Sequence, residues 1–169
     1  FGFDVVFPMG YNSSVNLNFG ETITFLNNKI HKMSMQGKEI IVVASQAQTI
    51  PYYCNNLLEF PQMQHSFALG TKPDAVVLCV NYHDEIQYIK NTIFMLTGLT
   101  GASVIAIVMY PLTYSNNWSD IYGKPTHLIT DIEFETKALY WQSELHIPVF
   151  QLGKTHTTQE ICQRIIDFF

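Results

Sequence analysis

Short runs of β-branched and aliphatic residues alternate along this chain with longer segments of helical periodicity. Uninterrupted apolar runs are typical of strands that are buried on both faces of a parallel sheet. Between them, apolar residues recur at spacings of three and four, as on one face of an amphipathic helix. Such alternation predicts right-handed βαβ units. We therefore predict a single α/β domain over residues 1–169, a three-layer sandwich with a mainly parallel sheet.

The pattern also predicts where the elements lie. Strands are expected over 40–44, 75–80, 103–109 and 148–152, and helices over 20–36, 55–69, 84–98, 131–146 and 159–169. Asp84 is predicted to be a helix N-cap, because aspartate accepts hydrogen bonds from first-turn amides. Gly98 and Gly101 are predicted to end that helix. The long polar stretch 112–130 is interpreted as a functional loop or a flap.

The chain has few charged residues, and this limits the kinds of partner that it is expected to bind. Charged residues are 14% of the sequence, whereas globular chains average about 25%. We expect such a surface to be partly covered, by a second subunit of a homodimer or by more of the same polypeptide. The net charge is −5 and the nine Lys and Arg residues form no cluster, which argues against a nucleic-acid partner.

The location of the protein is predicted from what the sequence lacks. No apolar stretch reaches the ~20 residues that a membrane helix needs, and no signal peptide is visible. The three cysteines are widely spaced and suit a reducing compartment. We therefore expect a cytoplasmic protein with no membrane partner.

Ligands of open parallel sheets bind outside the carboxyl ends of the strands, and polar side chains follow two of the predicted strands. Ser45 and Gln46 follow the 40–44 run, where they are candidate ligand contacts or members of an ordinary loop. Asn81, His83 and Asp84 follow the 75–80 run. His83 and Asp84 are candidates for a general acid/base pair; the alternative, which we favour, is a helix cap beside a solvated histidine.

Several kinds of site are not indicated. The histidines show no metal-ligand spacing, so we expect no metal site. No GxSxG nucleophile motif occurs, and neither GxxxxGK[ST] nor GxGxxG is present. The chain begins at Phe1 rather than Met. We therefore expect a C-terminal fragment whose phosphate-binding loop, if the protein has one, precedes residue 1.

Four segments together carry a family resemblance. They are GFD at 2–4 with FPMGYN at 7–12, IVVASQ at 41–46 with Pro51, and KPDAVVLCVN at 72–81. These segments resemble the C-terminal part of a bacterial peptide-maturation-system protein family, whose members accompany radical-SAM enzymes and bacteriocin-like precursor peptides. The layout is also similar to P-loop-like proteins that include D-glutamate N-acetyltransferases.

The resemblance implies a Rossmann-like or P-loop-like fold with the phosphate-binding loop N-terminal to this chain. A nucleotide or acyl-CoA is then expected to bind only together with that missing part. By matching position, Ser45, Gln46 and Asn81 are implied to face the ligand. A precursor peptide or a maturation enzyme is the implied partner, and no catalytic residue is assigned.

Three hypotheses on function follow. The first is an accessory α/β domain of a ribosomal-peptide maturation system that binds a nucleotide-like ligand or a partner protein. The second is a P-loop-like acyl- or phosphoryl-transferase, with His83 or Asp84 assisting proton transfer. The third is a non-catalytic interaction scaffold, which the low charge and the 14% aromatic content favour.

Overall fold

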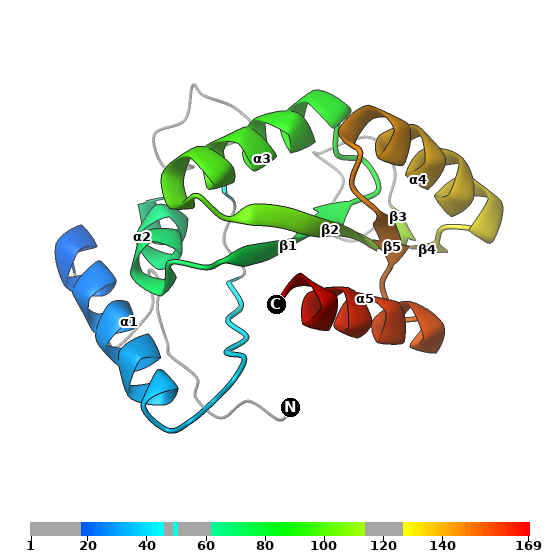
Figure 1. The fold of residues 1–169 in the computed structure, drawn as a ribbon. Helices are drawn as coiled ribbons and strands as arrows, with labels where there is room; N and C mark the ends of the chain where they lie inside the picture. The colour runs from blue at the N-terminus through cyan, green and yellow to red at the C-terminus, as the bar shows by residue number, and fades with distance from the viewer. Residues whose placement is uncertain (1–17, 46–48, 51–61, 114–126) are drawn as a thin grey trace. The chain divides into compact units, whose positions relative to one another are not determined.

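The computed structural model describes residues 18–45, 49–50, 62–113 and 127–169 (Figure 1). The chain divides into two compact units, Phe1–Lys72 and Pro73–Phe169, which are considered separately. The expectation of a single domain stays a prediction. Within the described residues, no helix is both long and apolar enough to cross a membrane.

Unit 1 contains two packed helices, α1 (Phe19–Ser34) and α2 (Gln62–Thr71). A capping box begins α1: the Asn18 side chain accepts a hydrogen bond from the Glu21 amide, and the Glu21 carboxylate accepts one from the Asn18 amide. The helices approach closely at Gly70, where an added Cβ would lie 2.8 Å from the Cβ of Leu26. The helix expected over 20–36 is confirmed. Of the helix expected over 55–69, residues 55–61 lie outside the described residues, and α2 ends two residues later than expected.

The strand predicted over 40–44 is wrong. Residues 40–45 form neither strand nor helix, and Val42 is 78% exposed. A strand needs a hydrogen-bonded neighbour, and none of the described strands pairs with this segment. An apolar β-branched run satisfies the side-chain preference of a strand without supplying that neighbour.

Unit 2 is built on a parallel sheet of β1 (Ala75–Asn81), β2 (Ser103–Tyr110) and β5 (Val149–Gln151), in the order β1-β2-β5. Three long helices accompany it: α3 (Ile86–Thr100), α4 (Asp131–Leu145) and α5 (Thr155–Phe168). In Figure 1, α3 and α4 cover one face and α5 lies on the other. Both crossovers run in the same direction along the sheet, so right-handed connections place α3 and α4 on the same face. The predicted α/β class is confirmed.

The core of unit 2 lies between the sheet and helices α3 and α4. Alternate strand residues face these helices because successive side chains of a strand point to opposite faces. Trp141 of α4 is the largest member and is 1% exposed. The buried residues of this core are Leu78, Val80, Ile89, Leu96, Ile107, Met109, Ile129, Ala138, Trp141 and Val149.

Strand β2 contains a β-bulge, and the only arginine of the chain forms a hydrogen bond to it. Val76 pairs with Val104 and Val77 with Ala106, so Ile105 has no partner in β1. The Ile105 carbonyl instead accepts a hydrogen bond of 2.7 Å from Nε of Arg164 in α5. Arg164 therefore replaces a missing ladder contact and ties α5 to the sheet.

Two short strands near the ends of the stretch 112–130, which was predicted to be a loop, pair with each other. β3 (Leu112–Thr113) and β4 (His127–Leu128) pair antiparallel. Residues 114–126 lie outside the described residues. Two predicted helix ends also differ: Gly98 lies inside α3, and the left-handed Gly101 (φ 79°) is its C-cap, as expected. The last helix begins at Thr155 rather than 159.

Candidate functional site

The turn that follows β1 is held by Asp84. Its Oδ2 accepts a hydrogen bond of 2.9 Å from the backbone N–H of Asn81, and its own N–H donates to the Asn81 carbonyl at 3.1 Å. The prediction that Asp84 caps α3 is wrong, because the N-cap is Glu85, whose side chain makes no capping hydrogen bond. The Asp84 carboxylate instead satisfies the last amide of the strand and closes the turn between strand and helix.

Asp84 is a buried carboxyl group, with only 6% of the residue exposed. Burial raises its pKa above the usual aspartate value, because desolvation disfavours the charged form. The Asn81 amide and the positive charge of Lys137 act in the opposite direction but do not cancel the effect. The Asp84 charge also adds to the effect of burial in raising the pKa of Tyr88.

Lys137 comes to this turn from α4. Its Nζ lies 4.5 Å from the centroid of the Tyr82 ring and 5.1 Å from that of Trp141, both within cation–π range. Burial lowers the pKa of Lys137, and the negative charge of Asp84 partly opposes this shift. Asp84 and Lys137 thus form an electrostatically coupled acid and base at the carboxyl edge of the sheet. Perturbed pKa values of neighbouring acids and bases are concentrated at clefts and functional sites.

His83 connects the turn to the base of the 112–130 stretch. Its Nε2 lies 2.5 Å from the Oγ1 of Thr113 in β3, a side chain that is itself buried. The His83 ring also makes an edge contact with Tyr82, at 5.3 Å between centroids. His83 is half-buried and hydrogen-bonded, which corrects the interpretation of a solvated loop residue.

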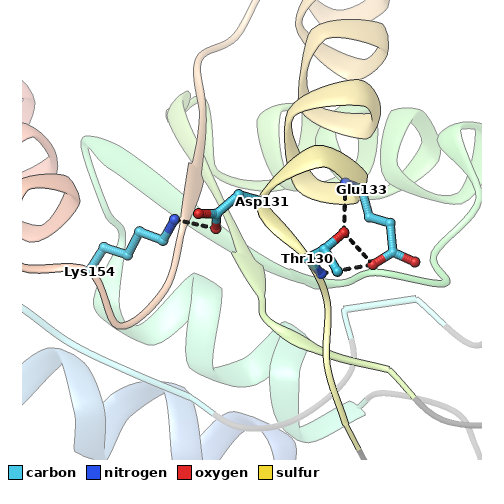
Figure 2. Close-up of polar contacts among 4 residues, drawn as sticks. All are labelled: Thr130, Asp131, Glu133 and Lys154. Carbon is cyan, nitrogen blue, oxygen red and sulfur yellow. Dashed lines mark hydrogen bonds and ion pairs between the residues drawn. The ribbon is translucent and has the colours of Figure 1, made fainter.

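A capping box between Thr130 and Glu133 begins α4 (Figure 2). Thr130 Oγ1 accepts from the Glu133 amide at 3.2 Å, and Glu133 Oε2 accepts from the Thr130 amide at 2.7 Å. Lys154, which precedes α5, binds Asp131 at 2.5 Å. The acidic side chains Asp131 and Glu133 complement the helix dipole. The Glu133 amide at this helix end is therefore satisfied within the chain.

The five residues predicted from sequence have separate outcomes. Asn81, His83 and Asp84 lie together in the turn after β1. Ser45 belongs to unit 1, where its Oγ donates a hydrogen bond to Oε1 of Gln64. Gln46 lies outside the described residues.

Lys137, Thr113 and Tyr82 were missed by the sequence interpretation. A signal for Lys137 was present, because it follows Phe134 by three residues and precedes Trp141 by four, on the stripe that faces the core. A cation in such a stripe needs a specific environment. Thr113 lies 30 residues from His83, and no local pattern links the two.

The chain was compared with protein-family models, curated proteins and solved structures, and none of the three comparisons gave a match. Among the residues that the structure describes, no three His, Cys, Asp or Glu side chains are grouped so that they could hold a metal ion. The chemical character of the site therefore rests on the Asp84–Lys137 pair, His83 and the surrounding aromatic rings.

Proposed function

We propose that this chain is an accessory α/β domain of a ribosomal-peptide maturation system, with a Rossmann-like or P-loop-like fold, that binds a nucleotide-like ligand at the carboxyl edge of β1. The main support for this binding site is the position of the Lys137 ammonium group, which lies against Tyr82 and Trp141 beside the β1 turn. The assignment to peptide maturation rests on the sequence resemblance alone.

The charge at this edge favours an anionic ligand. Lys137 supplies a cation within cation–π range of the Tyr82 and Trp141 rings. His83 adds a ring nitrogen, and Asn81 an exposed amide side chain, at the end of the same strand. Ligands bind at this edge in open parallel sheets. Together these features support phosphate-bearing molecules, such as a nucleotide or acyl-CoA, as the ligand class.

The binding proposal is tested by calorimetric titration of the purified full-length protein with ATP, acetyl-CoA and a precursor-type peptide. Lys137→Met retains a long apolar side chain but removes the charge, so it should weaken binding of the phosphate ligand by about tenfold or more. Lys90→Met is the matched control, because Lys90 forms a partly exposed ion pair with Glu144 at 2.6 Å. Absence of heat with every ligand, or equal losses in both variants, would refute the proposal.

A second candidate function is proton transfer in an acyl- or phosphoryl-transferase. The raised pKa of Asp84 and the lowered pKa of Lys137 favour it, because such shifts bring an acid and a base toward neutral pH. His83→Ala and Asp84→Asn should then abolish turnover while ligand binding persists. Turnover that is unchanged in both variants would exclude this role.

A further inference from the structure

Strand β5 ends in a glutamine whose side-chain oxygen is buried. Gln151 is 7% exposed, and its Oε1 is shielded from solvent but accepts no hydrogen bond from any residue that the structure describes. The large majority of buried side-chain oxygens in folded proteins have a partner, because an unsatisfied one lowers the free energy of unfolding. The fold therefore retains a polar group whose cost its own contacts do not offset.

Gln151 lies at the same edge of the sheet as the proposed ligand site. It is the last residue of β5 and pairs with Met109 of β2, which in turn pairs with Val80 of β1. Val80 and Met109 belong to the core under α3 and α4, as does Val149, two residues before Gln151. Because side chains two apart in a strand point to the same face, Gln151 is also on the face that α3 and α4 cover.

Lys137 lies near the β1 end of this row of paired residues. Its Nζ is 4.5 Å from the ring centroid of Tyr82, which packs against the same core directly after β1. Neighbouring strands are about 4.8 Å apart, so β1 and β5, with β2 between them, are roughly 10 Å apart. A single phosphate group is too small to contact both ends of the row. Lys137 and Gln151 therefore suit different parts of one ligand.

The two groups have opposite hydrogen-bonding character. The ammonium group of Lys137 only donates, which suits a phosphate, whereas Oε1 of Gln151 only accepts. An ionised phosphate offers acceptor oxygens alone, so it cannot satisfy this oxygen. The hydroxyl groups of a ribose and the amino group of a nucleobase are donors. A nucleoside attached to the phosphate therefore supplies the donor that Gln151 lacks.

We propose that Gln151 binds the nucleoside part of the ligand, accepting at Oε1 a hydrogen bond from a ribose hydroxyl or a base amino group, while Lys137 binds the phosphate. This inference rests on the proposed function, and it narrows the ligand class from phosphate-bearing molecules to those that carry a nucleoside. The terminal torsion of a glutamine side chain is soft. The oxygen, which is shielded in this conformation, can thus turn toward the edge when a ligand binds.

Calorimetric titration of the purified full-length protein with ATP and with tripolyphosphate, which has the phosphate chain but no nucleoside, tests this proposal. Gln151→Met retains the length of the side chain and removes the amide. It should weaken ATP binding at least tenfold and leave tripolyphosphate binding unchanged. Lys137→Met should weaken the binding of both ligands.

The outcomes separate this inference from the function on which it rests. If Gln151→Met left ATP binding unchanged, or weakened both ligands equally, the role of Gln151 would be refuted while the effect of Lys137→Met still supported the ligand site. If the unaltered protein bound neither ligand, the proposed function would fail, and the role of Gln151 with it.

Thermal unfolding in the absence of ligand distinguishes a ligand contact from a structural one. Gln151→Met should raise the unfolding midpoint by several degrees, because it removes a buried oxygen that lacks a partner. Thr22→Val is the matched control, since Thr22 in α1 is 1% exposed and its Oγ1 likewise has no partner among the described residues. This variant should also raise the midpoint but leave ATP binding unchanged. A lower midpoint for Gln151→Met would indicate that an internal water satisfies Oε1, and it would overturn the proposal.

Discussion

Two replacements of Asp84 separate its hydrogen bond from its charge. Asp84→Ala removes the acceptor of the Asn81 amide, a contact of 2.9 Å at a residue that is 6% exposed. Little water can replace that acceptor, so we expect the free energy of unfolding to fall by about 1–3 kcal/mol. Asp84→Asn keeps a side-chain oxygen at the same place, so its cost at acidic pH should stay below about 1 kcal/mol.

The Asp84 charge makes the stability of the folded protein depend on pH. The direction of the Asp84 pKa shift determines the sign of that dependence. Burial raises the pKa of Asp84 in the folded protein above its unfolded value. The folded state then holds the proton more tightly, so the contribution of Asp84 is fully present below the unfolded pKa. It is lost as pH rises through the folded pKa. Each pKa unit of difference corresponds to about 1.4 kcal/mol.

The measurement is urea unfolding of the unaltered protein and both variants between pH 4 and 8, followed by tryptophan fluorescence (about four pH values suffice to resolve the trend). As pH rises, the stability of Asp84→Asn should improve relative to the unaltered protein, because only the latter must bury a carboxylate. A difference that is independent of pH, or that moves the other way, would refute the assignment of a desolvated carboxyl group. Asp84→Ala should be the least stable of the three at acidic pH.

Other predictions test the packing. Gly70→Ala should destabilise unit 1 by about 1–3 kcal/mol despite a better helix propensity, because its Cβ would lie 2.8 Å from that of Leu26. Gly98→Ala, with no atom within 4 Å of the new Cβ, should stabilise α3 by roughly 0.5–1 kcal/mol; thermal unfolding measures both, and equal signs would contradict the packing argument. Arg164→Met should cost about 1–3 kcal/mol in urea unfolding by leaving the Ile105 carbonyl without its donor, and an unchanged midpoint would show that water satisfies the bulge.

The sequence correctly predicted those elements whose hydrophobic pattern agrees with their environment in the fold. β1 and β2 are apolar runs that do lie in a parallel sheet, and α3 carries Ile89 and Leu96 on its buried face as expected. Among the candidate residues, the sequence grouped only those that are contiguous: Asn81, His83 and Asp84 share one turn. Thr113 reaches the turn only through the position of β3, which no local pattern specifies. The stripe of α4 indicates that Lys137 faces inward, but it does not indicate which turn Lys137 approaches.

The failure at 40–44 has a related cause. Side-chain preference indicates which residues tolerate a strand, whereas hydrogen bonding to a neighbour creates one. Val42, 78% exposed, has the first property without the second. The same distinction applies to Asp84: its type favours a helix cap, but its carboxylate accepts from the amide of Asn81 at the end of β1. In both cases the residue types predicted one structural role, and the backbone groups available for hydrogen bonding determined the role that the structure shows.

Helix α4 departs twice from the pattern of a simple amphipathic helix, and the two departures can be separated. Lys137 is a cation in the inward stripe, whereas Leu139 is an apolar residue on the outward face. Departures from local rules concentrate at functional surfaces, and Lys137 belongs to the ligand site that we propose. Since the two side chains lie on opposite faces of α4, Lys137→Met should weaken ligand binding, whereas Leu139→Glu should leave ligand binding unchanged. If Leu139→Glu weakened ligand binding as much as Lys137→Met, the effect of Lys137→Met could not be assigned to the loss of its charge beside the β1 turn.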